Sequence, residues 1–232
     1  MGEFVHLHLH SEFSLLYGVN RINEIPKNIK AKGMDAVAIT DHGNMFGAVN
    51  FYDACIKEGV KPIIGAEVYL SRRDMHSKEY GIDTTRYHLI LLVKNEIGYR
   101  NLTHLVTASN LEGMYYKPRI DKKILEEYSE GLICLSACMA GEISQLVLED
   151  ETKARQAAIW YKKVFGDDYY IEIQSNGLAN QKLVNQKLIK LARELEIELV
   201  ATNDCHYAER ENVIDQEIVI CIQTGKKLSD ED

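Results

Sequence analysis

Residues 5–10 read VHLHLH, and this stretch predicts the first strand of the protein, over residues 4–9. In an extended strand successive side chains alternate faces, so His6, His8 and His10 are expected to project to one side. Eight histidines occur in the chain, and three of them share these six residues. Crowded imidazoles repel one another when charged and lose solvation when buried neutral. A divalent metal is therefore the expected reason for the cluster.

Outward from this stretch, short apolar runs alternate with longer amphipathic segments along the chain. Strands are expected at residues 4–9, 36–40, 62–70, 87–94, 131–136, 169–174 and 198–203. Helices are expected at residues 22–33, 45–59, 98–112, 121–129, 140–165, 180–197 and 212–223. Such alternation predicts an α/β fold with a parallel sheet covered by helices. If the sheet closes into a barrel, its functional site lies at the C-terminal ends of the strands.

Composition predicts a single globular domain of 232 residues, with 46% apolar and 27% charged residues. No apolar stretch approaches the roughly 20 residues of a membrane span, so no membrane association is expected. Five cysteines are an odd number, which argues against a disulfide framework and favours the cytoplasm. The net charge of −8 lacks the basic balance of a nucleic-acid binder. A nucleic-acid substrate would have to be held by metals, by a local basic patch or by another domain.

Polar residues gather at the ends of predicted strands, as a barrel site requires. The residues that follow this rule are His8, His10, Asp41, His42, Glu67, Asp204 and His206. His88 departs from it, since it lies at the start of its predicted strand. Two neighbours on one strand face, such as Asp204 and His206, suit adjacent metals.

Each of the first candidates has a purely structural alternative. His8 and His10 could be a buried structural pair, and His6 is expected to support the site or the core rather than to bind metal. At the second strand end we favour His42 as a ligand and Asp41 as its orienting or proton-handling neighbour. Asp41 could instead cap the following helix.

The remaining candidates are a carboxylate, a histidine and a cysteine in apolar surroundings. Glu67 lies in an apolar strand, where a buried carboxylate needs a cation or several donors, and its two oxygens suit a bridge between two metals. A salt bridge to a lysine is the alternative. His88 could be a core histidine, and Cys138 a small buried side chain.

Two cations follow a pair of tyrosines at residues 115–119, which read YYKPR. Lys117 and Arg119 are candidates for holding a phosphate, and the neighbouring aromatic rings could stack on a base. An ordinary surface loop explains the same residues nearly as well.

Taken in order along the chain, the candidate residues form a set of short motifs. They are HLHS at residues 8–11, TDHG at 40–43, GAE at 65–67, His88, Cys138 and NDCH at 203–206. This combination resembles the PHP family (polymerase and histidinol phosphatase), and more narrowly the N-terminal PHP domain of bacterial DNA polymerase III alpha subunits. The resemblance covers essentially the whole chain. It implies a distorted seven-stranded β/α (TIM-like) barrel.

The resemblance also implies two to three divalent ions of zinc, manganese or iron at the strand ends. The first would be held by His8, His10, Glu67 and Asp204, the second by Glu67, His88 and Cys138, and the third by His42 and His206. Metal-competent polymerase members carry LLDG after the first motif, whereas residues 15–18 here read LLYG. A phenol ordinarily ionises near pH 10, so Tyr17 is a poorer ligand than a carboxylate. We expect the third site to be weak or empty.

The function implied by the resemblance is a 3′–5′ exonuclease that acts on the 3′ end of DNA. Asp204 or His206 would position water, Asp41 would handle protons, and Arg119 with Lys117 would hold the phosphate. Two alternatives are a catalytically degenerate domain that braces the polymerase, and a small-molecule phosphomonoesterase similar to histidinol phosphatase. The chain is expected to be one PHP domain excised from a longer subunit. Its partners would be the remaining polymerase domains and other replisome subunits.

Overall fold

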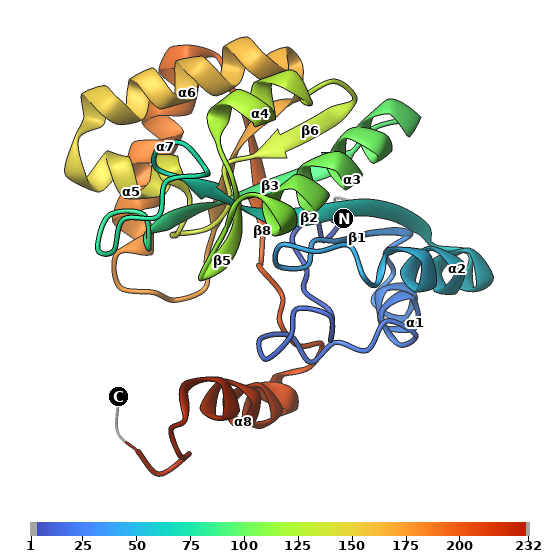
Figure 1. Ribbon diagram of the computed structural model, residues 1–232. Helices are drawn as coiled ribbons and strands as arrows, with labels where there is room; N and C mark the ends of the chain where they lie inside the picture. The colour runs from blue at the N-terminus through green and yellow to red at the C-terminus, as the bar shows by residue number, and fades with distance from the viewer. Residues whose placement is uncertain (1–3, 231–232) are drawn as a thin grey trace.

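The computed structural model describes residues 4–230 (Figure 1). Strands form where apolar and β-branched residues concentrate between turn residues. The strands are β1 (Ala36–Ile39), β2 (Lys61–Ser71), β3 (Arg86–Val93), β4 (Met114–Tyr115), β5 (Lys117–Ile120), β6 (Leu132–Leu135), β7 (Tyr169–Gln174) and β8 (Glu198–Thr202). The helices are α1 (Ile25–Ala31), α2 (Ala48–Glu58), α3 (Glu96–Leu111), α4 (Lys122–Glu127), α5 (Glu142–Glu149), α6 (Glu151–Phe165), α7 (Gln181–Leu195) and α8 (Val213–Thr224), with short 3-10 turns η1 (Gly166–Asp168) and η2 (Arg210–Asn212).

Every predicted strand after the first has a counterpart, and each predicted helical segment contains a helix. The helix expected over residues 140–165 is wrong in one respect, because it is two helices. Asp150 has extended backbone (φ −156°, ψ 98°), and its side chain accepts hydrogen bonds from the backbone N–H groups of Thr152 and Lys153. Asp150 therefore ends α5 and caps α6. The short strands β4 and β5 were not expected.

The predicted first strand, residues 4–9, is not a regular strand, but it closes the ring. His6 forms a parallel bridge with Val37 of β1, and Leu9 forms one with Cys205, just after β8. The backbone N–H of His10 donates to the Cys205 carbonyl at 2.8 Å, which completes the junction. With this segment, β1, β2, β3, β6, β7 and β8 make a distorted seven-membered barrel, as the fold prediction required.

The sheet is mixed, so the prediction of an all-parallel sheet is wrong. Strand β3 runs antiparallel to both β2 and β6, whereas β1 with β2, β6 with β7, and β7 with β8 are parallel. The start of β3 therefore lies at the same edge as the ends of the parallel strands. This reversal explains why His88 can join the other site residues although it lies early in its strand.

The core divides between the two faces of β3. Leu89 and Leu91 belong to the large apolar cluster beneath the helices, which includes residues of α3, α5, α6 and α7. Ile90 packs with Ala38 and Leu135 in a small separate cluster on the opposite face. Glu67 pairs directly with Ile90, so the carboxylate shares a face with this inner cluster.

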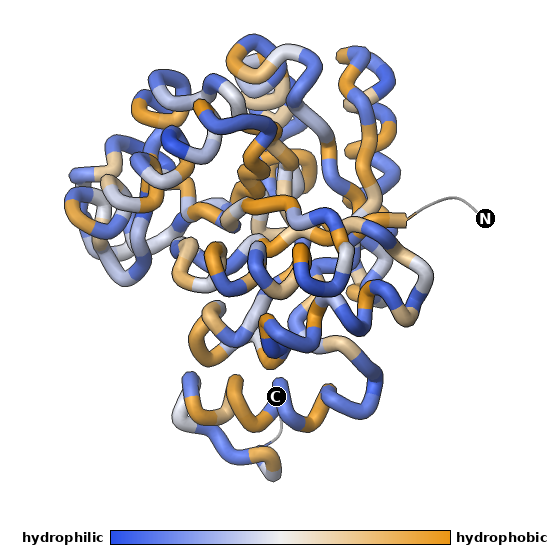
Figure 2. Tube along the Cα trace, turned by 90° about the vertical axis from the view of Figure 1, so that its right-hand side faces the viewer, coloured by the Kyte–Doolittle hydropathy of each residue, from blue (hydrophilic) through white to orange (hydrophobic). Residues whose placement is uncertain are grey.

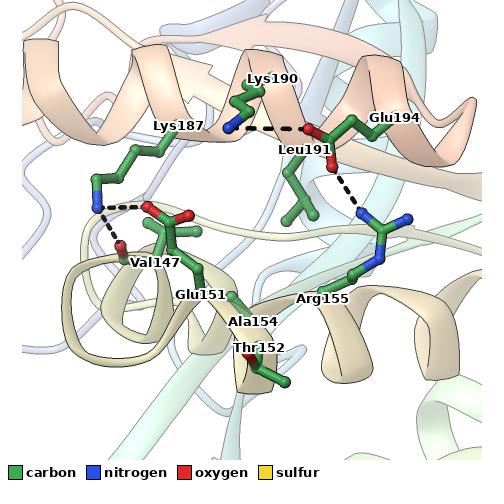
Figure 3. Close-up of a pocket in the computed structure, with 9 residues that line it drawn as sticks. All are labelled: Val147, Glu151, Thr152, Ala154, Arg155, Lys187, Lys190, Leu191 and Glu194. Carbon is green, nitrogen blue, oxygen red and sulfur yellow. Dashed lines mark hydrogen bonds and ion pairs between the residues drawn. The ribbon is translucent and has the colours of Figure 1, made fainter.

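A groove of about 220 Å³ lies between α6 and α7 (Figure 3). Its charges pair with one another: Lys187 with Glu151 at 2.8 Å, and Arg155 with Glu194 at 2.6 Å. Exposed ion pairs of this kind contribute at most about 1 kcal/mol each. We interpret the groove as a helix–helix junction, since its charges satisfy each other.

Helix α8 extends away from the rest of the molecule at the bottom of Figure 1, and Figure 2 shows apolar residues along it. None of its residues is buried, and Ile214, Ile218 and Ile222 are exposed. Between residues 4 and 230 no helix is both long enough and apolar enough to cross a bilayer.

Candidate metal centre

Seven side chains from separate segments meet at one end of the barrel. They are His8 and His10 of the closing segment, His42 after β1, Glu67 of β2, His88 of β3, and Asp204 and His206 after β8. Their ligand atoms form three overlapping groups, in each of which all ligand atoms lie within 4.8 Å of one another. The groups are His8, His10 and Asp204; His10, His42 and His206; and His42, Glu67 and His88.

Glu67 lies at the middle of this arrangement. Its Oε2 is 2.6 Å from His42 Nδ1, and its Oε1 is 2.7 Å from His88 Nδ1. Each oxygen therefore faces a different histidine, as a bridging carboxylate would. On the other side, Asp204 Oδ1 lies 3.1 Å from the Nε2 atoms of both His8 and His10.

These atoms are buried and close together, yet several form no hydrogen bond. Both carboxylate oxygens of Glu67, Asp204 Oδ1 and His42 Nδ1 are four of the six buried side-chain atoms without a partner in residues 4–230. Each unsatisfied buried group costs about 1–3 kcal/mol. Imidazole nitrogens and carboxylate oxygens aimed at one another are the donor set of a divalent cation site, so the residues fit a metal cluster.

Electrostatics favour forms that bind cations. Burial alone would raise the pKa of Glu67, but His88 and His42 outweigh it and hold this pKa well below the ordinary value. Burial, reinforced by His42, lowers the pKa of His10 to about 3. Burial likewise lowers the pKa of His206. At neutral pH Glu67 is thus ionised and both imidazoles are neutral, which are the states that ligate metals.

Burial also opposes the charged form of His8, but two carboxylates reverse the outcome. Asp204 and Glu172 raise the pKa of His8 well above its ordinary value. Glu172 of β7 is 1% exposed and accepts a hydrogen bond from His8 Nδ1 at 2.8 Å. Thr202 Oγ1 and Gln174 Nε2 also donate to Glu172. The bond to this carboxylate occupies His8 Nδ1 and leaves Nε2 facing the cluster, and Nε2 would have to lose its proton to bind a metal.

Sequence reasoning missed Glu172, although a signal was present. It is a carboxylate within the apolar strand YYIEIQ at residues 169–174, the same pattern that singled out Glu67. The two differ in their partners. Glu67 has no hydrogen bond to either oxygen, whereas Glu172 accepts three through Oε1.

Asp41 orients the cluster and does not belong to any of the three ligand groups. It accepts hydrogen bonds from Ser11 N and Oγ and from Ser14 Oγ, at 2.6–2.7 Å. Ser14 Oγ lies 3.0 Å from His10 Nδ1, so Asp41 acts on His10 through Ser14. The helix-cap alternative is wrong, since Gly47 is the N-cap residue of α2 and no side chain caps that helix.

Three further candidates lie beside the centre. The ring of Tyr17 is 4.9 Å from that of His42, edge to face. Lys117 Nζ lies 4.9 Å from the centre of the Tyr17 ring and 3.5 Å from its hydroxyl. Cys138 Sγ is 3.9 Å from His88 Nδ1 but belongs to none of the three ligand groups.

His6 lies outside the cluster, so the expectation that it shares a face with His8 and His10 is wrong. Its Nδ1 is 3.4 Å from Cys205 Sγ, and its ring packs edge-on against Phe4. The regular alternation fails because residues 5–10 form isolated bridges rather than a continuous strand.

Arg119 has a structural role, which corrects its assignment to phosphate binding and catalysis. It is fully buried, and its guanidinium donates to the carbonyls of Gly113, Met75, Ser77 and Asp83 at 2.9–3.1 Å. These bonds hold the loop between β2 and β3 against β5. Four of the five N–H donors are thereby used, so the guanidinium is not available to a substrate.

Backbone strain concentrates at the rim of the centre. Within residues 4–230, four of the five non-glycine residues with positive φ are Leu16 (64°), Tyr116 (61°), Ala137 (63°) and Asp204 (52°). The first three immediately precede Tyr17, Lys117 and Cys138. Such conformations cost about 1–3 kcal/mol each and persist where the surrounding structure imposes them, commonly at functional sites.

Comparison with known proteins agrees with this geometry. The model of the PHP domain family matches residues 6–176. The chain belongs to the PHP domain family. It is 49% identical over 232 residues to DNA polymerase III subunit alpha of Borreliella burgdorferi, covering 99% of this chain and 20% of that protein. The corresponding subunit of Campylobacter jejuni is 46% identical over 243 residues, covering 100% of this chain and again 20% of the relative.

This PHP chain thus spans about a fifth of the length of those relatives. Among solved structures, a protein from Bifidobacterium adolescentis described as a metal-dependent phosphoesterase superposes with a TM-score of 0.62 at 12% identity, covering 96% of this chain and 97% of that one. An amidohydrolase from Chromobacterium violaceum gives 0.56 at 13% identity, covering 93% and 96%. At such low identity these two likenesses show the fold alone.

Proposed function

We propose that this PHP domain is a metal-dependent phosphodiesterase that removes nucleotides from the 3′ end of a DNA strand. The observation that carries the proposal is the set of buried, unsatisfied ligand atoms on Glu67, Asp204 and His42 at the functional end of the barrel. Two or three divalent ions of zinc, manganese or iron would occupy the three ligand groups. Ions in such a cluster polarise a phosphoryl oxygen and make water a stronger nucleophile.

The protein's own groups divide the remaining work. Glu67 would offer metal ions its two oxygens, which face His42 and His88. Asp41, through Ser14, and Glu172 fix the rings of His10 and His8. His206 is neutral and 18% exposed at its side chain, so it can orient water or accept a proton at the rim. Lys117, which lies beside Tyr17 and Tyr69 at the cluster, supplies a positive charge for a phosphate oxygen. It does so alone, because Arg119, which was expected to share this role, is bound to backbone carbonyls.

As part of the same proposal, we infer a replicative context for this activity, because the relatives are DNA polymerase III alpha subunits. The domain would belong to a longer polymerase subunit in the cytoplasm, with the other domains of that subunit and replisome proteins as partners. A second candidate function is an inactive domain that braces such a polymerase. It is favoured by the Tyr17 ring, which stands 4.9 Å from His42 where a carboxylate ligand is expected.

The test is cleavage of a 5′-labelled single strand by the purified chain with Mn²⁺ or Zn²⁺. We expect stepwise shortening from the 3′ end, which His10→Ala abolishes. His104→Ala is a matched control, because His104 is an exposed histidine of α3 that stacks on Tyr128 away from the cluster. Absence of cleavage by the wild type, or equal cleavage by His10→Ala, would refute the phosphodiesterase. A folded wild type that binds no metal would favour the bracing role.

A further inference from the structure

The strand pair β2–β3 continues outward from the metal centre and carries a row of residues on one face. Tyr69 pairs with His88, and Ser71 pairs with Arg86. Residues that oppose each other in an antiparallel pair share a face, as do residues two apart along a strand. Arg86 is therefore the next residue outward from His88 on the metal-facing side. The step from one to the other is about 6.8 Å along the strand.

Tyr69 lies between this arginine and the metal ligands. Its ring is nearly parallel to the ring of His42 (13°), with the centres 6.0 Å apart. The Arg86 guanidinium carbon lies over the Tyr69 ring at 5.6 Å, and Lys117 Nζ lies over it at 5.7 Å. Two cations from different strands thus converge on one aromatic ring beside the cluster.

Neither cation is neutralised. Across residues 4–230, no carboxylate forms an ion pair with Arg86 or Lys117. The guanidinium of Arg86 donates one hydrogen bond, from Nη1 to the Thr84 carbonyl at 2.8 Å, so other donors are left for a ligand. The contrast with Arg119 is direct, since backbone carbonyls use four of its donors. In a chain of net charge −8, two unpaired cations beside a cluster of ligands indicate an anion subsite.

We infer that Arg86 and Lys117, with Tyr69 between them and the cluster, bind the second phosphate of a single-stranded polynucleotide. Neighbouring phosphates of one strand are about 3.4 Å apart along the axis of a duplex and farther apart when the strand is extended. The distance from His88 to Arg86 along β3 is about 6.8 Å, so it spans at least one nucleotide. A mononucleotide has only one phosphate and cannot occupy the cluster and this subsite together. The subsite therefore selects polynucleotides over small phosphomonoesters. This inference rests on the proposed function, because it names the substrate of the same site.

The experiment compares the wild type with Arg86→Gln in two binding assays with Mn²⁺ present. The first measures fluorescence anisotropy of a short 5′-fluorescein oligothymidylate, protected at its 3′ end by phosphorothioate linkages, over a range of salt concentrations. The second measures competition by dTMP. Arg193→Gln is the matched control, because it removes one exposed positive charge from the last turn of α7. Arg86→Lys keeps the charge and guards against a folding defect.

We expect Arg86→Gln to bind the oligonucleotide at least about ten-fold more weakly, as the loss of one charge-assisted contact predicts. The slope of log affinity against log salt should fall by about 0.7, the value for one phosphate of a single strand. Competition by dTMP should change less than two-fold, Arg86→Lys should restore the slope, and Arg193→Gln should match the wild type.

Equal affinity and slope in the wild type and Arg86→Gln would overturn the subsite, as would an equal loss of dTMP binding. A wild type that does not bind the oligonucleotide would overturn it as well. Failure of the proposed function looks different. A wild type that binds with the Arg86-dependent slope but cleaves nothing would refute the phosphodiesterase and leave the subsite standing.

Discussion

Replacement of Glu172 by glutamine tests whether this unexpected carboxylate controls the metal centre. The side chain is 1% exposed and accepts a hydrogen bond from His8 Nδ1 at 2.8 Å. Glutamine keeps the volume but removes the charge, and its amide oxygen can take the place of Oε1, which accepts the bonds from His8, Gln174 and Thr202. His8 then keeps an acceptor at Nδ1 but loses the carboxylate charge that makes its ring a stronger ligand.

The expected effect follows from the chemistry of such partners. Loss of a carboxylate that orients a metal-binding histidine costs about 10–100-fold in metal affinity, or about 1.4–2.7 kcal/mol. The loss should appear as weaker binding of the metal. The rate of the fully loaded protein should change less.

The assay is a metal titration of the purified chain against a chelator of known affinity, for the wild type and Glu172→Gln. Glu142→Gln is the control, because Glu142 is a buried carboxylate that bonds Lys122 Nζ and Tyr161 OH at 2.8 Å. It should lower the melting temperature without changing metal affinity. A folded Glu172→Gln protein with wild-type metal affinity would refute the reasoning.

Three other predictions concern the third metal, the β2–β3 loop and one tight contact. Tyr17→Asp should raise the metal content by up to one ion per chain in elemental analysis, and no gain would contradict our account of the third site. Arg73 lowers the pKa of Asp83, so this carboxylate stabilises the fold above its ordinary pKa of 3.8 and the stabilisation is lost as the pH falls. The difference in melting temperature between wild type and Asp83→Asn should therefore shrink below that pH, and a constant difference would exclude the ion pair as its cause. Gly98→Ala places a Cβ 1.8 Å from the Gly131 carbonyl oxygen, so it should lower the free energy of unfolding, measured in urea, by about 3 kcal/mol or more. An unchanged midpoint would show that the backbone at Gly131 moves aside without cost.

Much of the fold followed from local patterns, because apolar periodicity reports how each segment is buried. It located the central strands and the helices. It could not show that β3 runs antiparallel to β2, since strand direction depends on which distant segment supplies the hydrogen-bond partner. Apolar periodicity also predicted α5 and α6 as one helix, because the apolar pattern continues across Asp150, where the helical backbone is interrupted.

The candidate site was predictable where residue type and strand end coincide. His8, His10 and Asp204, which lie at predicted strand ends, form one of the three ligand groups, and Glu67 lies 3.7 Å from His8 and 3.4 Å from His10. Arginine residues were not predictable in this way, because a guanidinium suits a phosphate and a set of carbonyls equally well. Only the contacts show that Arg119 holds a loop, whereas Arg86, just before the strand predicted at residues 87–94, lies over the Tyr69 ring beside the cluster.

The sequence by itself determined which ligand groups this protein can offer to a metal, since the number of histidines and carboxylates and their order along the chain are local properties. The tertiary structure decided which of them meet, in which protonation state, and what stands beside them. The physical reason is that ligand geometry, burial and charge pairing arise between segments far apart in the chain. The VHLHLH stretch is an example. Its composition predicts a metal, but its pairing with β1 and Cys205 is what turns His8 and His10 toward the cluster and leaves His6 outside it.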